Sequence, residues 1–312
     1  MLLSLSALAF AHPHLDEVDQ EIVVWGDPFL QWEQRWLVQT EFRFPLATVL
    51  GIQEGQIAAT ESLRMRAVLD CDKDAPRGSR RWAVTCTIDD IAIQALVLGD
   101  SATPEGVWVL DQWDTILTGE HVRLTVRDDR AILSTDLPPV VQGDRAQRRQ
   151  RELMRQLAMR LVAPLQVDLP EWVSTGTSWF EPRTELLEMP SATAPLGISS
   201  VVHRLDEVDS HWVVQSQGKA AQVPGRILAL RNSDTFKLNY EGVSRFDQAT
   251  GLMVERVWYV GGQPTPSART GRGYHTFGQM LLLDDNDRPM LGDSAYVPIE
   301  DWTFDKDFAP GV

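Results

Sequence analysis

The sequence lacks the short motifs by which the common enzyme classes are recognised. It has no G-x-S-x-G nucleophile elbow, no H-E-x-x-H zinc motif, no phosphate-binding loop and no dinucleotide-binding fingerprint. The mechanisms that depend on those motifs therefore have no identifiable residues in this chain, and the sequence predicts no cofactor. The acidic run at 284–287 is expected to form a hairpin turn, because no glutamate closes it as a calcium loop would require.

Basic residues are also scarce. The 312 residues include 29 lysines and arginines against 44 aspartates and glutamates, which gives a net charge of -15. Because a phosphate backbone is bound by a basic surface, nucleic acid is excluded as an expected partner. Beyond the first residues, no stretch approaches the roughly 20 apolar residues of a transmembrane helix, so we expect no membrane span.

The first eleven residues are apolar or small and end in Ala9-Phe10-Ala11. This pattern is typical of the hydrophobic core and cleavage site of a secretory signal peptide, although the basic segment that usually precedes it is missing. We therefore expect a truncated signal peptide at residues 1–11, a mature chain that begins at His12, and a periplasmic or extracellular location.

Only two cysteines are present, Cys71 and Cys86. They lie on two β-like runs that a polar loop connects, and exported proteins mature in an oxidising compartment. We predict a disulfide bond between them, which in the chain-entropy model stabilises the fold by about 3 kcal/mol. The alternative is a pair of buried free thiols.

Most of the chain alternates apolar and polar residues as half-buried β-strands do. Eleven tryptophans are spread along it, and we interpret them mainly as sheet core, with an aromatic-lined groove as the alternative. Strands at this spacing without intervening helices predict antiparallel sheets. The predicted strands are 36–44, 63–71, 81–88, 91–98, 107–110, 121–127, 131–134, 197–205, 211–216 and 227–230.

One segment, residues 144–163, has the apolar period of an α-helix, with Leu153, Leu157 and Leu161 on its apolar side. A glycine-aspartate pair offers a cap at its start, and Pro164 ends the pattern. Its other faces carry six arginines. We interpret these as a solvated face that pairs with acidic neighbours; the alternative is docking to an acidic partner or to anionic lipid headgroups.

A long amphipathic hairpin is predicted over residues 239–260, with a turn at 247–251. Gly251 fits a turn position of positive φ, and Gly242 interrupts the first strand as a bulge or bend would. Because long twisted antiparallel strands coil, we expect the hairpin to form the concave floor of a curved sheet.

This floor is the candidate binding surface for an apolar small molecule or a protein or peptide partner. The candidate residues are Phe236, Tyr240 and Trp258, with Lys237 and Arg256 as polar anchors. The alternative is that the helix or the C-terminal hairpin fills the hollow, in which case the same residues belong to the core.

Between residues 164 and 260, the spacing Val173-x-x-Gly176-x-x-Trp179 precedes alternating strands and then a G-x-x-x-F-D-x-x-x-G pattern over residues 242–251. In this order the segment resembles a group of exported bacterial envelope domains of unknown function that are rich in β-structure. The resemblance implies a curved antiparallel sheet in the bacterial envelope, and it transfers no active-site residue.

We therefore predict a mainly β protein of the α+β type. Two antiparallel domains, each a curved sheet, half-barrel or sandwich, are expected to be linked by one α-helix. The predicted units are the signal peptide (1–11), an N-terminal β domain (12–140), the connecting helix (141–165), a C-terminal curved β domain (166–262), and a linker, hairpin and acidic tail (263–312).

These features favour a non-enzymatic binding or structural role in the envelope. Peripheral association of the protein with the envelope is part of this hypothesis. The alternative is a secreted enzyme of one of two kinds. A copper enzyme would use the mature N-terminus, with His12 and His14 as ligands and a further histidine from among His121, His203, His211 and His275. A hydrolase would use carboxylates such as Asp206, Glu207 and Asp209.

Overall fold

The computed structural model describes residues 22–24, 33–43, 60–73, 81–97, 112–127, 130–138, 143–165, 170, 172–181, 185–187, 196–222, 236–264 and 274–291. The first half contains β1 (Ile22–Val24), β2 (Glu33–Arg43), β3 (Thr60–Lys73), β4 (Arg81–Val97), α3 (Trp113–Leu117), β5 (His121–Arg127), β6 (Arg130–Thr135), α4 (Arg145–Val162) and the 3-10 turn η1 (Ala163–Leu165). The second half contains β7 (Trp172–Ser174), β8 (Ser178–Glu181), β9 (Glu185–Leu187), β10 (Leu196–Val208), β11 (His211–Gln222), β12 (Phe236–Asp247), β13 (Met253–Pro264) and β14 (Tyr274–Leu282). No helix in these ranges is long and apolar enough to cross a membrane.

The long strands form one antiparallel sheet of twelve strands. Its order is β6-β5-β4-β3-β2-β14-β13-β12-β11-β10-β8, and β9 also pairs with β10. Strands β1 and β7 form a separate two-stranded sheet. The predicted mainly β fold with a curved antiparallel sheet is confirmed.

A single strand pair joins the two halves of the sheet. Strand β2 lies beside β14, with Trp36 opposite Leu282 and Thr40 opposite Gly278. The sheet is therefore continuous through the ranges that we assigned to two β domains, whereas the domain boundaries themselves stay a prediction.

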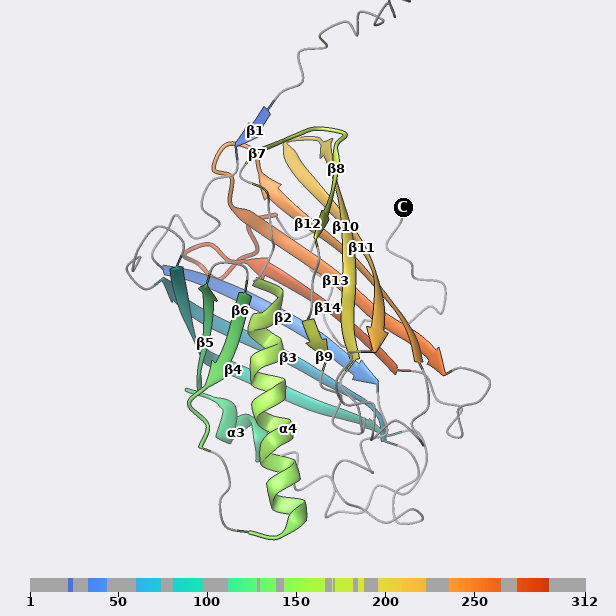
Figure 1. Ribbon diagram of the computed structural model, residues 1–312. Coiled ribbons are helices and arrows are strands. Elements are labelled where there is room, and N and C mark those ends of the chain that lie inside the picture. The colour runs from blue at the N-terminus through green and yellow to red at the C-terminus, as the bar shows by residue number, and fades with distance from the viewer. Residues whose placement is uncertain are drawn as a thin grey trace, which may run out of the picture.

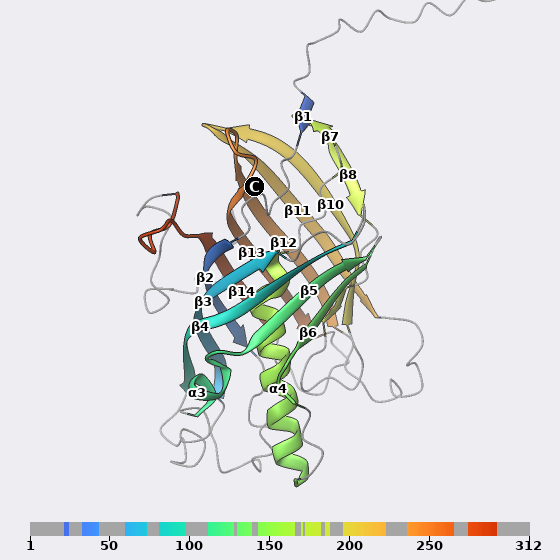
Figure 2. The ribbon, with the colours of Figure 1, turned by 90° about the vertical axis from the view of Figure 1, so that its left-hand side faces the viewer.

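Helix α4 lies against the inner face of the sheet, which curves around it (Figures 1 and 2). The apolar side of the helix and the inner-face residues of β2 to β5 and β10 to β14 belong to one buried cluster. Leu153, Leu157 and Leu161 are each at most 1% exposed, as predicted for the apolar side of the helix. Burying this side against the sheet supplies the apolar contacts that a lone helix of this length would lack.

The ends of α4 agree closely with the sequence prediction. Asp144 is the N-cap: its carboxylate accepts a hydrogen bond from the Gln147 backbone N–H at 2.8 Å, and the Gln147 side chain accepts one from the Asp144 backbone N–H. This reciprocal arrangement is a capping box. At the other end, the chain passes through Ala163 into η1, where Pro164 stops the α-helical hydrogen bonding.

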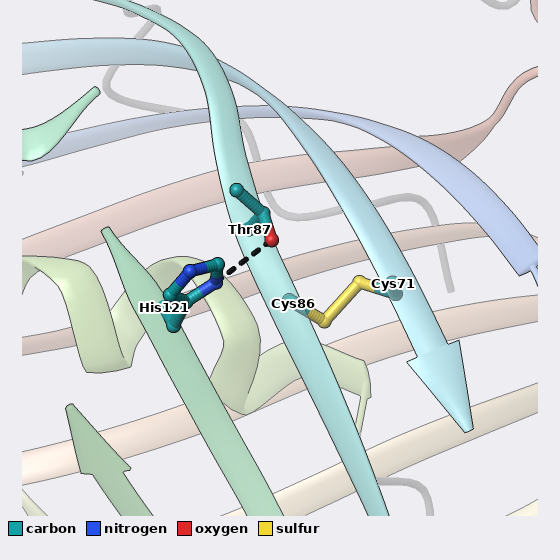
Figure 3. The surroundings of a disulfide bond; sticks show 4 residues. All are labelled: Cys71, Cys86, Thr87 and His121. Atoms are coloured by element: carbon teal, nitrogen blue, oxygen red, sulfur yellow. Dashed lines mark hydrogen bonds between the residues drawn. A yellow bond between two sulfur atoms is a disulfide. The ribbon is translucent and has the colours of Figure 1, made fainter. Parts of the chain in front are cut away.

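The predicted disulfide bond is present between β3 and β4 (Figure 3). Cys71 and Cys86 lie directly opposite each other, with their Cα atoms 3.9 Å apart, and both side chains are buried on the inner face. On the neighbouring pair of strands, Thr87 Oγ1 lies 2.9 Å from His121 Nδ1.

The structure corrects the prediction that residues 81–88 and 91–98 form two strands. Strand β4 runs through both, and Asp89 is an extra residue, because its neighbours pair with the consecutive residues Val68 and Leu69 of β3. A bulge of this kind adds a residue without ending the strand. The Asp89 carboxylate accepts a hydrogen bond from Arg35 Nη2 at 3.1 Å, which explains an aspartate at this position.

The predicted hairpin over residues 239–260 is formed by β12 and β13. Gly251 has φ of 70°, as its turn position requires. The irregular register lies between Arg245 and Phe246, however, and Gly242 pairs regularly with Trp258, so the expected bulge at Gly242 is wrong. Gly242 instead leaves room for the Tyr240 side chain, because a Cβ atom on Gly242 would lie 2.9 Å from the Tyr240 hydroxyl oxygen.

The remaining sequence predictions have mixed outcomes. The turn at 284–287 is a hairpin turn, in which the Asp284 carboxylate accepts hydrogen bonds from two backbone N–H groups and Leu283 pairs with Pro289. Helix α3 was not predicted. The predicted signal peptide and the predicted strands at 107–110 and 227–230 lie outside the described residues.

Candidate ligand-binding site on the inner face of the sheet

One row of residues crosses the inner face of the C-terminal half from strand to strand. Residues directly paired in an antiparallel sheet point to the same face. The pairing therefore places side chains of this row side by side, and most of them are small or flat. The row is Trp179 (β8), His203 (β10), Ser216 (β11), Gly242 (β12), Trp258 (β13), Gly278 (β14) and Thr40 (β2).

Two hydrogen bonds link residues beside this row on the inner face to the chain that follows α4. The Arg256 guanidinium donates one hydrogen bond to the Tyr240 hydroxyl oxygen at 2.7 Å and another to the carbonyl oxygen of Pro164 at 2.6 Å. Carbonyl groups at a helix C-terminus lack partners within the helix and carry partial negative charge, so a cation is favourable there. Arg256 therefore links the floor of the sheet to the residues that follow the helix.

Three of the predicted binding residues, Tyr240, Arg256 and Trp258, lie on neighbouring strands of the inner face, but they are in the interior. Tyr240 is 5% exposed, Arg256 5% and Trp258 7%, and the Pro164 carbonyl oxygen of η1 accepts a hydrogen bond from Arg256. In this conformation the protein's own chain occupies that part of the hollow, which is the alternative stated from the sequence. Phe236 and Lys237 lie on β12, and their side chains are outside the described part of the structure. A ligand-binding role for these five residues stays a prediction.

A second cluster lies at the edge of the same row, where β8 ends the sheet. The indole of Trp179 stacks on the imidazole of His203, with ring centroids 5.2 Å apart and an interplanar angle of 21°. His203 Nδ1 lies 2.9 Å from Ser216 Oγ, and the imidazole is 3% exposed. Trp179, unlike the buried members of the row, remains partly exposed.

Two indole N–H groups on the inner face have no acceptor. Nε1 of Trp179 and Nε1 of Trp36 are both buried, and neither donates a hydrogen bond to any protein group in the described structure. A buried donor without a partner is unfavourable by about 1 to 3 kcal/mol. The edge of the row at Trp179 thus combines apolar surface, partial exposure and an unused donor.

Only one indirect indication of this cluster is present in the sequence. The spacing Val173-x-x-Gly176-x-x-Trp179 forms β7, a turn with Gly176 at φ of 81°, and β8. The turn is fixed to β10, because the Gly176 N–H donates to the Leu205 carbonyl oxygen at 2.7 Å. This contact places Trp179 opposite His203. Nothing in the sequence around Ser216 indicates that this residue belongs to the cluster.

The residues of the enzyme alternatives do not converge in the described structure. Asp206 pairs with Arg204 at 3.0 Å, Glu207 accepts from the Gln248 side chain at 3.0 Å, and Asp209 lies in the β10–β11 turn. Among the described residues, no group of three or more histidines, cysteines or acidic residues is placed to hold a metal ion.

The histidines considered for copper lie on different strands. His203 is on β10, His211 begins β11 and His121 begins β5; for His275, on β14, the side chain is outside the described structure. His12 and His14 also lie outside the described residues, so the copper alternative stays a prediction.

Comparison with known proteins gives no family. No protein-family model and no curated protein sequence matches the chain. Among solved structures, the chain is similar to one titled "lipid-protein interactions in lipovitellin", with a TM-score of 0.44 and 7% sequence identity. The match covers 80% of this chain and 24% of that one, so the chain spans about a quarter of the length of that protein. At this TM-score we draw no functional conclusion from the likeness.

Proposed function

We propose that the protein is an exported, non-catalytic binding protein whose ligand is an apolar molecule with a hydrogen-bond acceptor at one end. The ligand enters at the β8 edge of the inner face, beside Trp179. It lies along the row towards Trp258, where the residues after α4 move to admit it.

The observation that carries this proposal is the unpartnered indole N–H of Trp179 at the partly exposed end of an otherwise buried row. Ligand sites are mostly apolar and contain a few polar groups that fix orientation. An acceptor on the ligand would satisfy the Trp179 donor, while the stacked His203 ring holds the indole in place. The protein residues around Trp179 would contact the apolar part of the ligand.

A binding role, rather than a catalytic one, is supported by how the polar side chains of the inner face are used. Arg256 holds Tyr240 and the end of α4, and His203 bonds to Ser216. Each of these contacts positions a side chain of the site. Export is supported by the apolar start of the sequence and by the buried disulfide bond.

Export is tested by expressing the full sequence and sequencing the N-terminus of the protein recovered from the periplasm and the medium. A mature chain that starts at His12 is the expected result. Recovery of the uncleaved protein from the cytoplasm alone would contradict export.

Binding is tested with a fluorescent long-chain fatty acid, whose carboxylate supplies the acceptor. Saturable binding with quenching of tryptophan fluorescence is expected. Trp179→Phe keeps the ring on His203 and removes the N–H, so it should weaken binding about three- to tenfold, the contribution of one hydrogen bond. Trp212→Phe is the matched control, because Trp212 is on the same face, two rows from Ser216 on β11.

Equal binding by the parent protein and by Trp179→Phe would place the ligand elsewhere. Absence of saturable binding, in protein from which bound lipid has been extracted, would contradict the proposed function.

A further inference from the structure

The N-terminal part of α4 extends beyond the sheet. The start of the helix lies past the ends of the neighbouring strands in both views (Figures 1 and 2). Leu153 is the first residue of α4 that is buried in the described structure; Gln147 and Arg148 are exposed, and Arg151 is half-buried. The described side chains of the first two turns are therefore exposed or half-buried, and none is fully buried.

These two turns carry a concentrated positive charge. The segment 145–151, RAQRRQR, contains four arginines and no acidic residue, in a chain whose net charge is -15. Basic side chains are unfavourable near a helix N-terminus, where the macrodipole is positive. The segment thus works against the stability of its own helix.

The expected pairing of these arginines with acidic neighbours is not found where their side chains are described. Arg148 contacts only the backbone carbonyl oxygen of Asp144, at 3.4 Å, and Arg151 has no ion pair in the described part of the chain. Arg155, one turn further on, is the first described arginine of the helix with an acidic partner, Glu152 at 3.8 Å. For the two arginines of the projecting end whose side chains are described, the solvated-face interpretation therefore lacks its ion pairs.

The composition of the projecting end favours a membrane surface over a folded protein partner. The core of a specific protein interface is built from buried aromatic and aliphatic side chains together with arginine. The first two turns offer only arginine, glutamine and one alanine. Anionic headgroups require no such core, because each arginine near the surface contributes electrostatic attraction independently.

We propose that the projecting end of α4, residues 145–151, docks the protein on a membrane surface that contains anionic lipid headgroups. The arginines approach the headgroups while the acidic remainder of the protein is held away. This inference stands independently of the ligand proposed above, since it concerns the solvent side of the helix.

The test is co-sedimentation of the full-length mature protein with vesicles of phosphatidylglycerol mixed into phosphatidylcholine. Binding is expected at low salt and should be lost at high salt, which screens the attraction. The double variant Arg148→Gln/Arg151→Gln should bind about 25-fold more weakly, at about fivefold for each arginine. Both changes keep good helix formers and remove unfavourable charge near the N-terminus, so the helix is retained.

The matched control is Arg66→Gln/Arg204→Gln, which changes the net charge equally at two exposed arginines on the outer face of the sheet. This control should bind the vesicles as the parent does. Equal loss in both double variants would show a net-charge effect and would overturn the proposal. Binding to immobilised polyglutamate but not to the vesicles would overturn it as well, and would assign the segment to an acidic polypeptide.

Discussion

The indole of Trp258 lies over Gly278 of the neighbouring strand. A Cβ atom placed on Gly278 would be 2.0 Å from Cζ2 of the indole, a distance that atoms do not adopt without rearrangement. The two residues are directly paired between β13 and β14, and Trp258 is 7% exposed. The absence of a side chain at Gly278 therefore leaves the space that the Trp258 indole occupies on the inner face of the sheet.

We predict that Gly278→Ala lowers the free energy of unfolding by about 1 to 3 kcal/mol, because the ring or the strand must shift in a packed core. Gly242→Ala is the matched comparison. Its new Cβ would meet the Tyr240 hydroxyl oxygen at 2.9 Å, a milder overlap than the 2.0 Å approach at Gly278, so the loss should be smaller. Urea unfolding followed by tryptophan fluorescence measures both. Equal stability of Gly278→Ala and the parent protein would show that the indole is not held against the strand.

The helix gives a second prediction. Leu157 is 1% exposed in the cluster that joins α4 to the sheet, so Leu157→Ala should lower the free energy of unfolding by about 2 to 5 kcal/mol. Gln150→Ala, on a half-buried turn outside that cluster, should change it by less than about 0.5 kcal/mol. If thermal melting of Leu157→Ala matches that of the parent, α4 is peripheral to the core.

The disulfide bond gives a third prediction. Cys71 and Cys86 close a loop of sequence separation 15, which in the chain-entropy model stabilises the fold by about 3 kcal/mol. The double variant Cys71→Ala/Cys86→Ala should therefore unfold at lower urea concentration than the oxidised parent, and the reduced parent should behave similarly. Alkylation of the non-reduced parent followed by mass spectrometry should label neither cysteine. Two labelled thiols would contradict the bond.

The features that the sequence predicted correctly are those with local signals. Asp144 and Pro164 marked the ends of α4 to within a residue, because caps and helix breakers act on adjacent backbone groups. The turn at Gly251 and the disulfide partners were likewise visible within short segments.

The features that could not be predicted depend on distant pairing. Nothing local indicates that β2 lies beside β14, although Thr40 Oγ1 donates to the Phe277 carbonyl oxygen across 237 residues of sequence. The same pairing places His203, Ser216 and Trp258 in one row. Asp89 was misplaced for a related reason: its bulge is defined by pairing with β3, and its ionic partner Arg35 lies on β2, both distant in sequence. The candidate site is thus a product of register, which the sequence pattern leaves open.

The turn between β12 and β13 gives a prediction of pH dependence. Partial burial by itself would raise the pKa of Asp247, but hydrogen bonds from the Thr250 hydroxyl and from the backbone N–H groups of Thr250 and Ala249, together with the nearby charge of His211, bring the pKa below its ordinary value. The two Thr250 contacts to Oδ1 of Asp247 measure 2.8 Å and 2.7 Å. The charged carboxylate is therefore favoured in the folded turn.

A lowered pKa in the folded state means that this stabilisation is fully present above the unfolded pKa of about 4 and is lost as the pH falls through the folded value. Asp247→Ala should thus lower the free energy of unfolding at neutral pH by about 1 kcal/mol, a modest value because the turn is partly solvated. The difference from the parent should begin to narrow below about pH 4, where the unfolded-state carboxylate is protonated, and should vanish only below the lowered folded pKa, where the folded carboxylate is protonated as well. Thr250→Val, which removes the hydroxyl donor, should raise the pKa of Asp247 towards its ordinary value. Urea unfolding across this pH range and an NMR titration of the Asp247 carboxylate measure these effects, and a stability difference that stays constant down to the lowest pH would contradict the assignment.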